Sequence, residues 1–385
     1  MNKKNTTPPD TEIKNLIQEY QNRRFDIAIK LALSITKRFP THHFSWKVLG
    51  VLLGITGRFQ EAILANKKTV ELSPIDFEAH NNLGNTLRSL NRFEEAEDSY
   101  KQAIKLKPDY IEAHYNLGNT LRINGKMLES KKSFKQVIKL KPEYAEAHFN
   151  LGNTLKDLGK LNEAKKSYKQ AILLKKNYAE AHNNLGLTYR ELGRLIDSEK
   201  NFQKAITLKT NFTIAINNLG ITLQEMGKLD EARKRFEQVI KIKPNFAEAY
   251  YNLGITHQEL NRLEDSEKNY KHAIDLKPDV AEYHNNLGMT LQELGKLDES
   301  EKSYKNAITL KPDYAESIFN LSMLLNLKGD LARGLNLYEW RYHEKKRDVR
   351  KPRQDLVWDG KKSIKNKKFL VYEEQGLGDI IQFYR

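Results

Sequence analysis

Apolar residues recur along the chain with the spacing of an amphipathic helix, and the helices so predicted recur every 34 residues. In the stretch 77–110, Leu83, Gly84, Leu87 and Leu90 fall at i, i+1, i+4 and i+7, so they share one helix face that packs against neighbouring helices. The pattern returns in register from residues 111, 145, 179, 213, 247 and 281. A fixed period of this length indicates one helix–turn–helix unit stacked many times, which predicts an all-α fold.

Positions are numbered here from 1 to 34 within each copy, with Phe77 at position 1. Position 8 is a glycine in the middle of the first predicted helix, where glycine costs roughly 1 kcal/mol relative to alanine. We expect it to permit a close crossing with a small residue of the second helix, at position 20. The glycines are Gly50, Gly84, Gly118, Gly152, Gly186, Gly220, Gly254 and Gly288, and the small residues are Ala62, Ala96, Ser130, Ala164, Ser198, Ala232, Ser266 and Ser300.

The ends of the predicted helices carry their own signals. Position 15 is glycine or asparagine in every copy from 43 to 314, and these residues enter the left-handed conformation cheaply at a helix C-terminus. A proline at position 32, such as Pro74 or Pro108, follows the second helix in most copies. Three acidic pairs resemble the capping pair that begins the next first helix: Asp109/Glu112, Asp279/Glu282 and Asp313/Glu316.

This pattern resembles the tetratricopeptide repeat (TPR), whose signature is W-x-x-L-G-x-x-Y, then A-x-x-x-F, then P. The signature residues appear most fully as Trp46, Leu49, Gly50, Ala62 and Pro74. The resemblance implies a right-handed superhelix (α-solenoid) of helix–turn–helix repeats, with the first helix of each pair on the inner face.

Outside the regular copies the pattern weakens at both ends. The N-terminal residues are polar and contain proline, so we expect them to be disordered. Degenerate copies on either side of the regular ones are expected to cap the array. The predicted order is a disordered tail (1–8), a solenoid (9–348, with eight regular repeats at 43–314 and caps at 9–42 and 315–348), a basic linker (349–367) and a short C-terminal segment (368–385).

The net charge of +15 is unevenly placed, since residues 341–368 hold 12 Lys or Arg against 4 Asp or Glu. A solvated linker accounts for this, and contact with nucleic acid or an acidic membrane stays open. Interleaved aromatic residues are missing there, so specific nucleic-acid binding is not expected. The chain has no cysteine, no apolar run after its N-terminal lysines and no stretch near the ~20 apolar residues of a membrane span. These features predict a cytoplasmic protein without a membrane span.

A second stripe on the first helices is polar and would face the groove of a superhelix. Position 6 is asparagine in eight successive copies, although asparagine is a mediocre helix former. Its amide donates and accepts, so it can pair with the main chain of a bound peptide, or alternatively with its own or the adjacent helix. We favour proteins or extended peptides as ligands of this ladder, which comprises Asn82, Asn116, Asn150, Asn184, Asn218, Asn252, Asn286 and Asn320.

Two further groove positions change along the chain. Position 9 is polar in early copies and apolar from Leu187 on, and position 12 is basic before it becomes glutamine at Gln224. We expect the N-terminal half of the groove to take polar or acidic peptide and the C-terminal half an apolar segment, with neutral drift among solvated positions as the alternative. The early groove residues are Asn85, Asn119 and Asn153 at position 9, and Arg88, Arg122, Lys156 and Arg190 at position 12.

The histidines do not suggest a metal site. His80, His114, His148, His182 and His284 occupy position 4 of different repeats, so their backbones lie about 10 Å or more apart, whereas zinc ligands lie about 2.0 to 2.1 Å from the ion. Position 4 is a tryptophan or a tyrosine in other copies, which indicates helix packing. The repeats contain no nucleophile elbow, phosphate loop or zinc-protease motif.

The sequence changes character after the repeats. W-D-G at 358–360, an apolar run at 368–373 and a glycine loop at 374–379 predict a turn, a strand and the start of a helix. These motifs resemble the junction in bacterial proteins that join TPRs to a heptosyltransferase-like glycosyltransferase, related in architecture to the O-linked N-acetylglucosamine transferases. The resemblance implies a truncated βα start of a Rossmann-like domain, with Asp379 as general base and a nucleotide sugar as donor in a full-length relative.

Two functions therefore remain open. In the first, the repeats bind proteins or peptides as the substrate-recruiting arm of a glycosyltransferase whose catalytic domain is mostly absent, so this chain is expected to be inactive and to hold no cofactor. In the second, the chain is a stand-alone TPR scaffold for protein–protein assembly. Association of copies through the solenoid also stays open.

Overall fold

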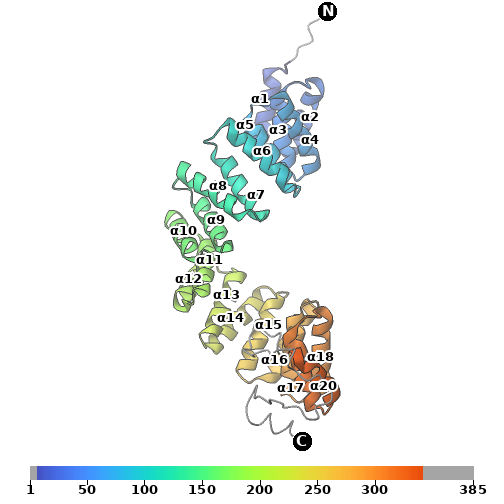
Figure 1. The fold of residues 1–385 in the computed structure, drawn as a ribbon. Coiled ribbons are helices and arrows are strands. Elements are labelled where there is room, and N and C mark those ends of the chain that lie inside the picture. The colour runs from blue at the N-terminus through green and yellow to red at the C-terminus, as the bar shows by residue number, and fades with distance from the viewer. Residues whose placement is uncertain (1–6, 341–385) are drawn as a thin grey trace, which may run out of the picture. The chain divides into compact units, whose positions relative to one another are not determined.

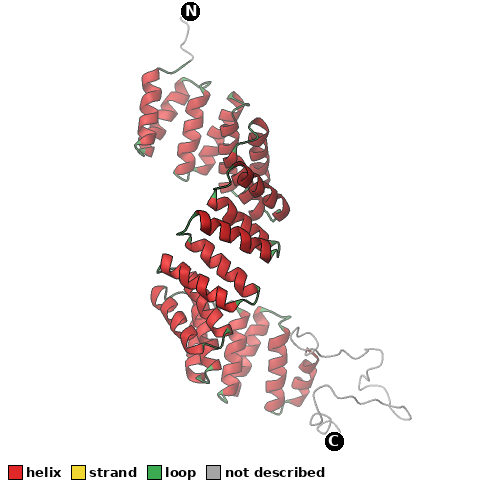
Figure 2. Cartoon of the chain, turned by 90° about the vertical axis from the view of Figure 1, so that its left-hand side faces the viewer, coloured by secondary structure: helices red, strands yellow, loops and turns green. Residues whose placement is uncertain are grey.

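The computed structural model describes residues 7–340, and every regular element in this part is an α-helix. Successive helices are joined by short loops (Figures 1 and 2). The chain divides into two compact units between Ala215 and Ile216, which lie within α13 (Thr213–Glu225). The predicted all-α array of helix pairs is therefore confirmed for residues 7–340. The strand predicted at 368–373 and residues 1–6 of the tail predicted at 1–8 lie outside the described residues.

The first unit contains twelve complete helices among its described residues. They are α1 (Asp10–Gln21), α2 (Phe25–Arg38), α3 (His43–Ile55), α4 (Phe59–Leu72), α5 (Phe77–Ser89), α6 (Phe93–Leu106), α7 (Ile111–Ile123), α8 (Met127–Leu140), α9 (Ala145–Asp157), α10 (Leu161–Leu174), α11 (Ala179–Glu191) and α12 (Leu195–Leu208).

The second unit continues the same alternation within its described residues. After α13 come α14 (Leu229–Ile242), α15 (Ala247–Glu259), α16 (Leu263–Leu276), α17 (Ala281–Glu293), α18 (Leu297–Leu310), α19 (Ala315–Leu327) and α20 (Leu331–Tyr338).

Helix contacts distinguish two sides of each unit. The first and second helices of a repeat pack against each other, and the second helix packs against the first helix of the next repeat. First helices of successive repeats also contact one another, as α5 contacts α7 and α7 contacts α9 in the first unit, and α15 contacts α17 in the second. We call the side on which first helices meet the inner face. The handedness of the predicted superhelix stays a prediction.

The mid-helix glycines pack against aromatic rings. A Cβ added at Gly84 would lie 2.6 Å from Tyr100 Cε1, and one at Gly186 would lie 2.9 Å from Phe202 Cε1. The ring comes from position 24 of the second helix and is buried in each of seven copies. The expected partner at position 20 is also near, since Ser130 Oγ donates to the Gly118 carbonyl at 2.8 Å. The ring therefore fits only because the glycine has no side chain. The rings are Tyr100, Phe134, Tyr168, Phe202, Phe236, Tyr270 and Tyr304.

The helix ends confirm one predicted signal and correct another. Position 15 has positive φ throughout the regular copies, for example 58° at Asn91 and 70° at Gly193. The predicted capping pairs are wrong, because the residue at the N-cap of α7 is Tyr110 and its side chain makes no capping bond. The cap falls one place after Asp109, at a residue whose ring packs on Phe77 with centroids 4.8 Å apart. The same shift places Val280 and Tyr314 at the caps of α17 and α19.

The position-4 ring usually bonds to the proline carbonyl of the preceding repeat. His80 Nε2 lies 2.9 Å from the Pro74 carbonyl oxygen. Trp46 Nε1 donates to the Pro40 carbonyl at the same distance, which explains why tryptophan and histidine share this position. His182 has Lys176 in place of the proline and lies 3.2 Å from Asn201 Oδ1 instead. The equivalent contacts at His114, His148 and His284 are 2.8 to 2.9 Å long.

A largely buried glutamate connects the last two described repeats. Glu301 on α18 accepts from Lys305 at 2.7 Å and from Lys328, which follows α19, at 2.6 Å. These two hydrogen bonds lower the pKa of Glu301 to about 2. Its side chain is only 12% exposed, so the interaction is less screened than a surface ion pair.

We predict that Gly186→Leu lowers the stability of its repeat by about 1 to 3 kcal/mol, because a buried ring already occupies the space beside Gly186. Gly54→Ala is the matched control. A Cβ there meets no described atom within 4 Å, so helix propensity should stabilise the repeat by about 1 kcal/mol or less. Native-state hydrogen exchange of α11 and α12 measures the first effect, and opening of all helices together would contradict an array of local contacts.

A second prediction concerns acid stability at α18 and α19. Because the folded-state pKa of Glu301 is lowered, its stabilisation should be fully present above pH ~4.5 and be lost as the pH falls toward 2. Thermal unfolding should show Glu301→Gln less stable than the parent at pH 6 and indistinguishable from it near pH 2. A constant difference across that range would contradict the assignment.

Candidate functional site

The asparagine ladder lies where first helices of successive repeats meet. Asn116 Nδ2 on α7 donates to Asn81 Oδ1 on α5 at 3.1 Å. The same bond recurs in the second unit at 3.2 Å, from Asn252 to Asn217 and from Asn320 to Asn285. Position 6 of one repeat is therefore hydrogen-bonded to position 5 of the repeat before it.

Where position 5 is a tyrosine, its hydroxyl replaces the amide as acceptor. Asn150 Nδ2 donates to Tyr115 OH at 2.8 Å and also lies 3.1 Å from Asn119 Oδ1. Asn286 Nδ2 donates to Tyr251 OH at 3.1 Å. Asn184 uses position 9 instead, with Nδ2 2.8 Å from Asn153 Oδ1. The alternative from the sequence, that the ladder asparagines bond to an adjacent helix, is thus observed, since these amides connect neighbouring repeats.

The ladder retains unused hydrogen-bonding capacity. Within residues 7–340, the Asn82 amide has no side-chain partner, and the Oδ1 atoms of Asn116, Asn252 and Asn320 accept no bond from the chain. Asn218 is buried, whereas the other seven are partly exposed. The oxygens of Asn116, Asn252 and Asn320 therefore remain available at the inner face while their Nδ2 atoms are held by the preceding repeat. The Oδ1 atoms of Asn150, Asn184 and Asn286 instead accept bonds from Asn153, Asn183 and Asn285.

In two early copies the position-9 asparagine accepts a hydrogen bond from the buried tyrosine. Tyr100 OH donates to Asn85 Oδ1 and Tyr168 OH donates to Asn153 Oδ1, both at 2.8 Å. Burial raises the pKa of Tyr100 to about 12, so the hydroxyl keeps its proton and donates. In these early copies the position-9 asparagine is consequently part of the packing around the ring.

In later copies the acceptor moves to position 12. Tyr270 OH donates to Gln258 Oε1 at 3.3 Å, and Tyr304 OH donates to Gln292 Oε1 at 3.2 Å. Position 9 in these copies is apolar. In the four copies whose ring is a tyrosine, the polarity change noticed in the sequence therefore accompanies a move of the acceptor for the buried hydroxyl from position 9 to position 12.

The basic residues at position 12 pair with acids of the next repeat. Arg122 lies 3.3 Å from Asp157, and Lys156 lies 3.3 Å from Glu191. Arg190 also has an interaction partner. Arg88 differs, because the equivalent place in the next repeat is the apolar Ile123. The positive charges of Arg122 and Lys156, which were expected to attract acidic peptide, are thus neutralised locally.

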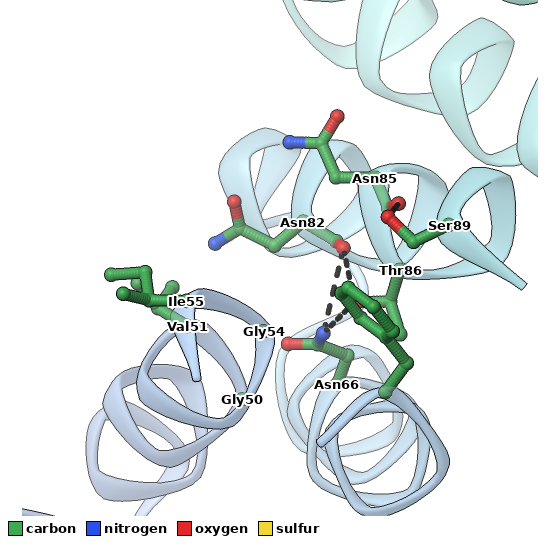
Figure 3. Close-up of a pocket in the computed structure, with 10 residues that line it drawn as sticks. Gly50, Val51, Gly54, Ile55, Asn66, Asn82, Asn85, Thr86 and Ser89 are labelled. Atoms are coloured by element: carbon green, nitrogen blue, oxygen red, sulfur yellow. Dashed lines mark hydrogen bonds between the residues drawn. The ribbon is translucent and has the colours of Figure 1, made fainter. Parts of the chain in front are cut away.

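A hollow of about 240 Å³ opens between α3, α4 and α5 (Figure 3). Its α3 wall includes Gly50, Val51, Gly54 and Ile55, and Asn66 of α4 lies at its base. The sequence analysis missed this feature. Its signal is that Asn66 is the one non-aromatic residue at position 24 of the regular copies, and that Gly54 occupies position 12, where seven copies have long polar side chains. Asn82, Asn85 and Ser89 line the opposite side.

Two further predictions concern a catalytic residue and a membrane span. Asp379 lies outside the described residues, so its proposed catalytic role stays a prediction from sequence. Within residues 7–340, no helix has the length and apolarity needed to cross a membrane.

Family models match the repeats in register. Models described as TPR repeat or tetratricopeptide repeat cover residues 84–125, 118–159, 152–193, 179–212, 223–261, 247–280 and 281–314, more than half of the chain. The chain belongs to the tetratricopeptide repeat proteins. No curated protein sequence matches it.

Two solved structures share the fold at low sequence identity, and a third is similar to part of the chain. A tetratricopeptide repeat protein from Parabacteroides merdae is 17% identical with a TM-score of 0.53, over 65% of this chain and 98% of that one. The Cut9-Hcn1 hetero-tetramer gives 14% identity and a TM-score of 0.52, over 78% of this chain and 59% of that one. YrrB, described as a TPR protein with an unusual peptide-binding site, gives 24% identity and a TM-score of 0.41, over 48% of this chain and 94% of that one.

The inner face allows a paired test of the structural role of the ladder. Asn150→Ala removes bonds to Tyr115 and Asn119, so we expect a loss of about 1 to 3 kcal/mol in the stability of α7 and α9. Asn82→Ala removes no side-chain bond and should change stability by less than about 0.5 kcal/mol. Urea unfolding followed by hydrogen exchange measures both. Equal losses would show that the inter-repeat bonds do not matter.

Proposed function

We propose that this TPR protein is a binding scaffold that holds an extended segment of a partner protein along the inner face of its repeats. The observation that supports this most strongly is the ladder, where the partly exposed amides of Asn82, Asn116, Asn252 and Asn320 keep unused acceptors at equivalent places in their repeats. An amide recognises the polar groups of a peptide unit and ignores its side chain. Such a face suits a partner with a common main-chain geometry and a varied sequence.

The inter-repeat bonds also orient the ladder. Asn116 Nδ2 is fixed by Asn81, so the Asn116 oxygen keeps one direction before any ligand arrives. A preorganised acceptor loses little rotamer entropy on binding, which favours affinity. Packed helices lie about 8 to 10 Å apart and an extended chain advances about 3.3 Å per residue, so a ligand would meet one rung about every third residue.

The charge pattern favours a neutral main chain over an acidic ligand. Arg122 and Lys156 already face carboxylates of the next repeat, and a ligand carboxylate would have to displace them. Exposed pairs of this kind are worth roughly 0.2 to 1 kcal/mol, so they adjust binding without dominating it. The two-part groove expected from the sequence stays a prediction, with a second explanation now available in the tyrosine acceptors.

Recruitment of substrates to a glycosyltransferase is a narrower version of the same role. It rests on the resemblance of residues 358–385, which lie outside the described residues, while the family matches concern the repeats. A stand-alone scaffold needs only the described inner face. Peptide binding by the first helices is common to both.

We predict that twelve-residue peptides selected from a random display library bind the full chain through the ladder. The double variant Asn82→Ala, Asn116→Ala should bind the selected peptides about tenfold or more weakly, because each lost pair of hydrogen bonds is worth about 1 kcal/mol or more. Isothermal titration calorimetry measures the dissociation constants.

Asn162→Ala is the matched control, because Asn162 is an exposed asparagine on α10, a second helix. It should bind the same peptides as tightly as the parent chain. Unchanged affinity in the double variant, with the fold intact by circular dichroism, would remove the ladder from the proposed function.

A further inference from the structure

We propose that the hollow between α3, α4 and α5 is a pocket for a single tyrosine side chain of the bound segment. This inference rests on the proposed function and adds a specific anchor to it. The repeat at 43–76 departs from the other regular copies at two places on the same side of the fold. Asn66 replaces the buried ring at position 24, and Gly54 replaces the long side chain at position 12.

Asn66 fills only part of the space that the ring takes in the other copies. Gly50 remains a glycine although no aromatic residue of its own repeat packs on it, and a Cβ there would lie 2.1 Å from Asn66 Oδ1. Beside Gly54 the wall is open, with no described atom within 4 Å of an added Cβ. The resulting volume of about 240 Å³ exceeds the roughly 150 Å³ cavity that holds a benzene ring.

The walls match an aromatic side chain. Val51, Ile55 and Phe59 supply apolar surface to the hollow. Ile55 lies beside the opening and is 51% exposed to solvent. The opposite wall carries Asn82, whose amide has no side-chain partner in the described chain. A ring could therefore enter from the inner face while the main chain of the same peptide reaches Asn82 (Figure 3).

The base of the pocket selects a ring that carries a donor. Asn66 is 2% exposed, and its Nδ2 donates to Thr86 Oγ1 at 2.9 Å and to the Asn82 carbonyl at 3.4 Å. These bonds fix the amide so that Oδ1 lies against Gly50, on the α3 side (Figure 3), where it accepts no bond from the described chain. An acceptor at the base of an apolar pocket favours a hydroxyl over a bare phenyl ring.

The chain itself shows the pairing that we infer. Tyr100 OH donates to Asn85 Oδ1 and Tyr168 OH donates to Asn153 Oδ1, in each case from a ring packed on a position-8 glycine. A ligand tyrosine in the hollow would reproduce the hydroxyl-to-amide half of this arrangement, with Asn66 Oδ1, which already lies against Gly50, as the acceptor. The repeat thus leaves to a partner the ring that its neighbours supply internally.

Binding of p-cresol, the side-chain analogue of tyrosine, tests the pocket in the full chain. Methyl NMR should show saturable shifts at Val51 and Ile55 in the parent chain, and toluene should bind more weakly because it cannot donate to Asn66. A Cβ at Gly54 meets no described atom within 4 Å, so Gly54→Leu should extend into the hollow and weaken p-cresol binding at least tenfold. The control Gln224→Leu, at the equivalent position of a repeat whose ring Phe236 is present, should leave it unchanged.

Absence of shifts at Val51 and Ile55, or equal binding by Gly54→Leu, would overturn the pocket. Equal affinity for toluene and p-cresol would overturn the role of Asn66 and the choice of tyrosine. Peptide selection separates this inference from the proposed function. Peptides selected for binding to the parent chain should carry a tyrosine at one fixed position. Peptides selected for binding to Gly54→Leu should still bind but should lack this tyrosine.

If peptides bind the parent through the ladder with no aromatic preference, the pocket is wrong and the scaffold function stands. If p-cresol binds at Val51 and no peptide binds, the pocket stands and the scaffold function fails.

Discussion

The packing of an aromatic ring into the gap left by a mid-helix glycine is the contact on which seven of the eight regular repeats depend. The ring lets the two helices of a repeat approach closely, and it is buried in seven of the described regular copies. The ring also contacts the next repeat, since Tyr100 shares a hydrophobic cluster with Leu117 and Leu121, so the core is continuous between neighbouring repeats. This explains why the sequence tolerates extensive change elsewhere while glycine stays at position 8.

The ring also organises the inner face. A buried tyrosine hydroxyl requires an acceptor, and the chain supplies it at position 9 in early copies and at position 12 in later ones. The ladder at position 6 is then held between repeats by its own donors. What remains for a ligand is a row of oriented amides and, beside Gly50, one place where the ring itself is missing. Structure and binding therefore use the same side chains.

Much of the fold follows from the sequence because the 34-residue period fixes where helices begin and end, as the positive φ of Asn91 shows. The partner of the glycine did not follow, because positions 20 and 24 recur equally and only the packing shows which one fills the gap. The caps were misplaced by one residue because an aromatic side chain at Tyr110 is needed for packing on the preceding repeat. The dual use of the ladder depends on which way each amide points, which composition does not encode.

The central claim is that oriented amides on the inner face bind the main chain of an extended peptide. The most direct test compares one selected peptide with versions that carry a single N-methyl group at each backbone nitrogen in turn. The account predicts a periodic loss of affinity, strong at about every third residue and weak between, measured by calorimetry on the full chain. Uniform tolerance of N-methylation, with affinity set by side chains alone, would contradict it.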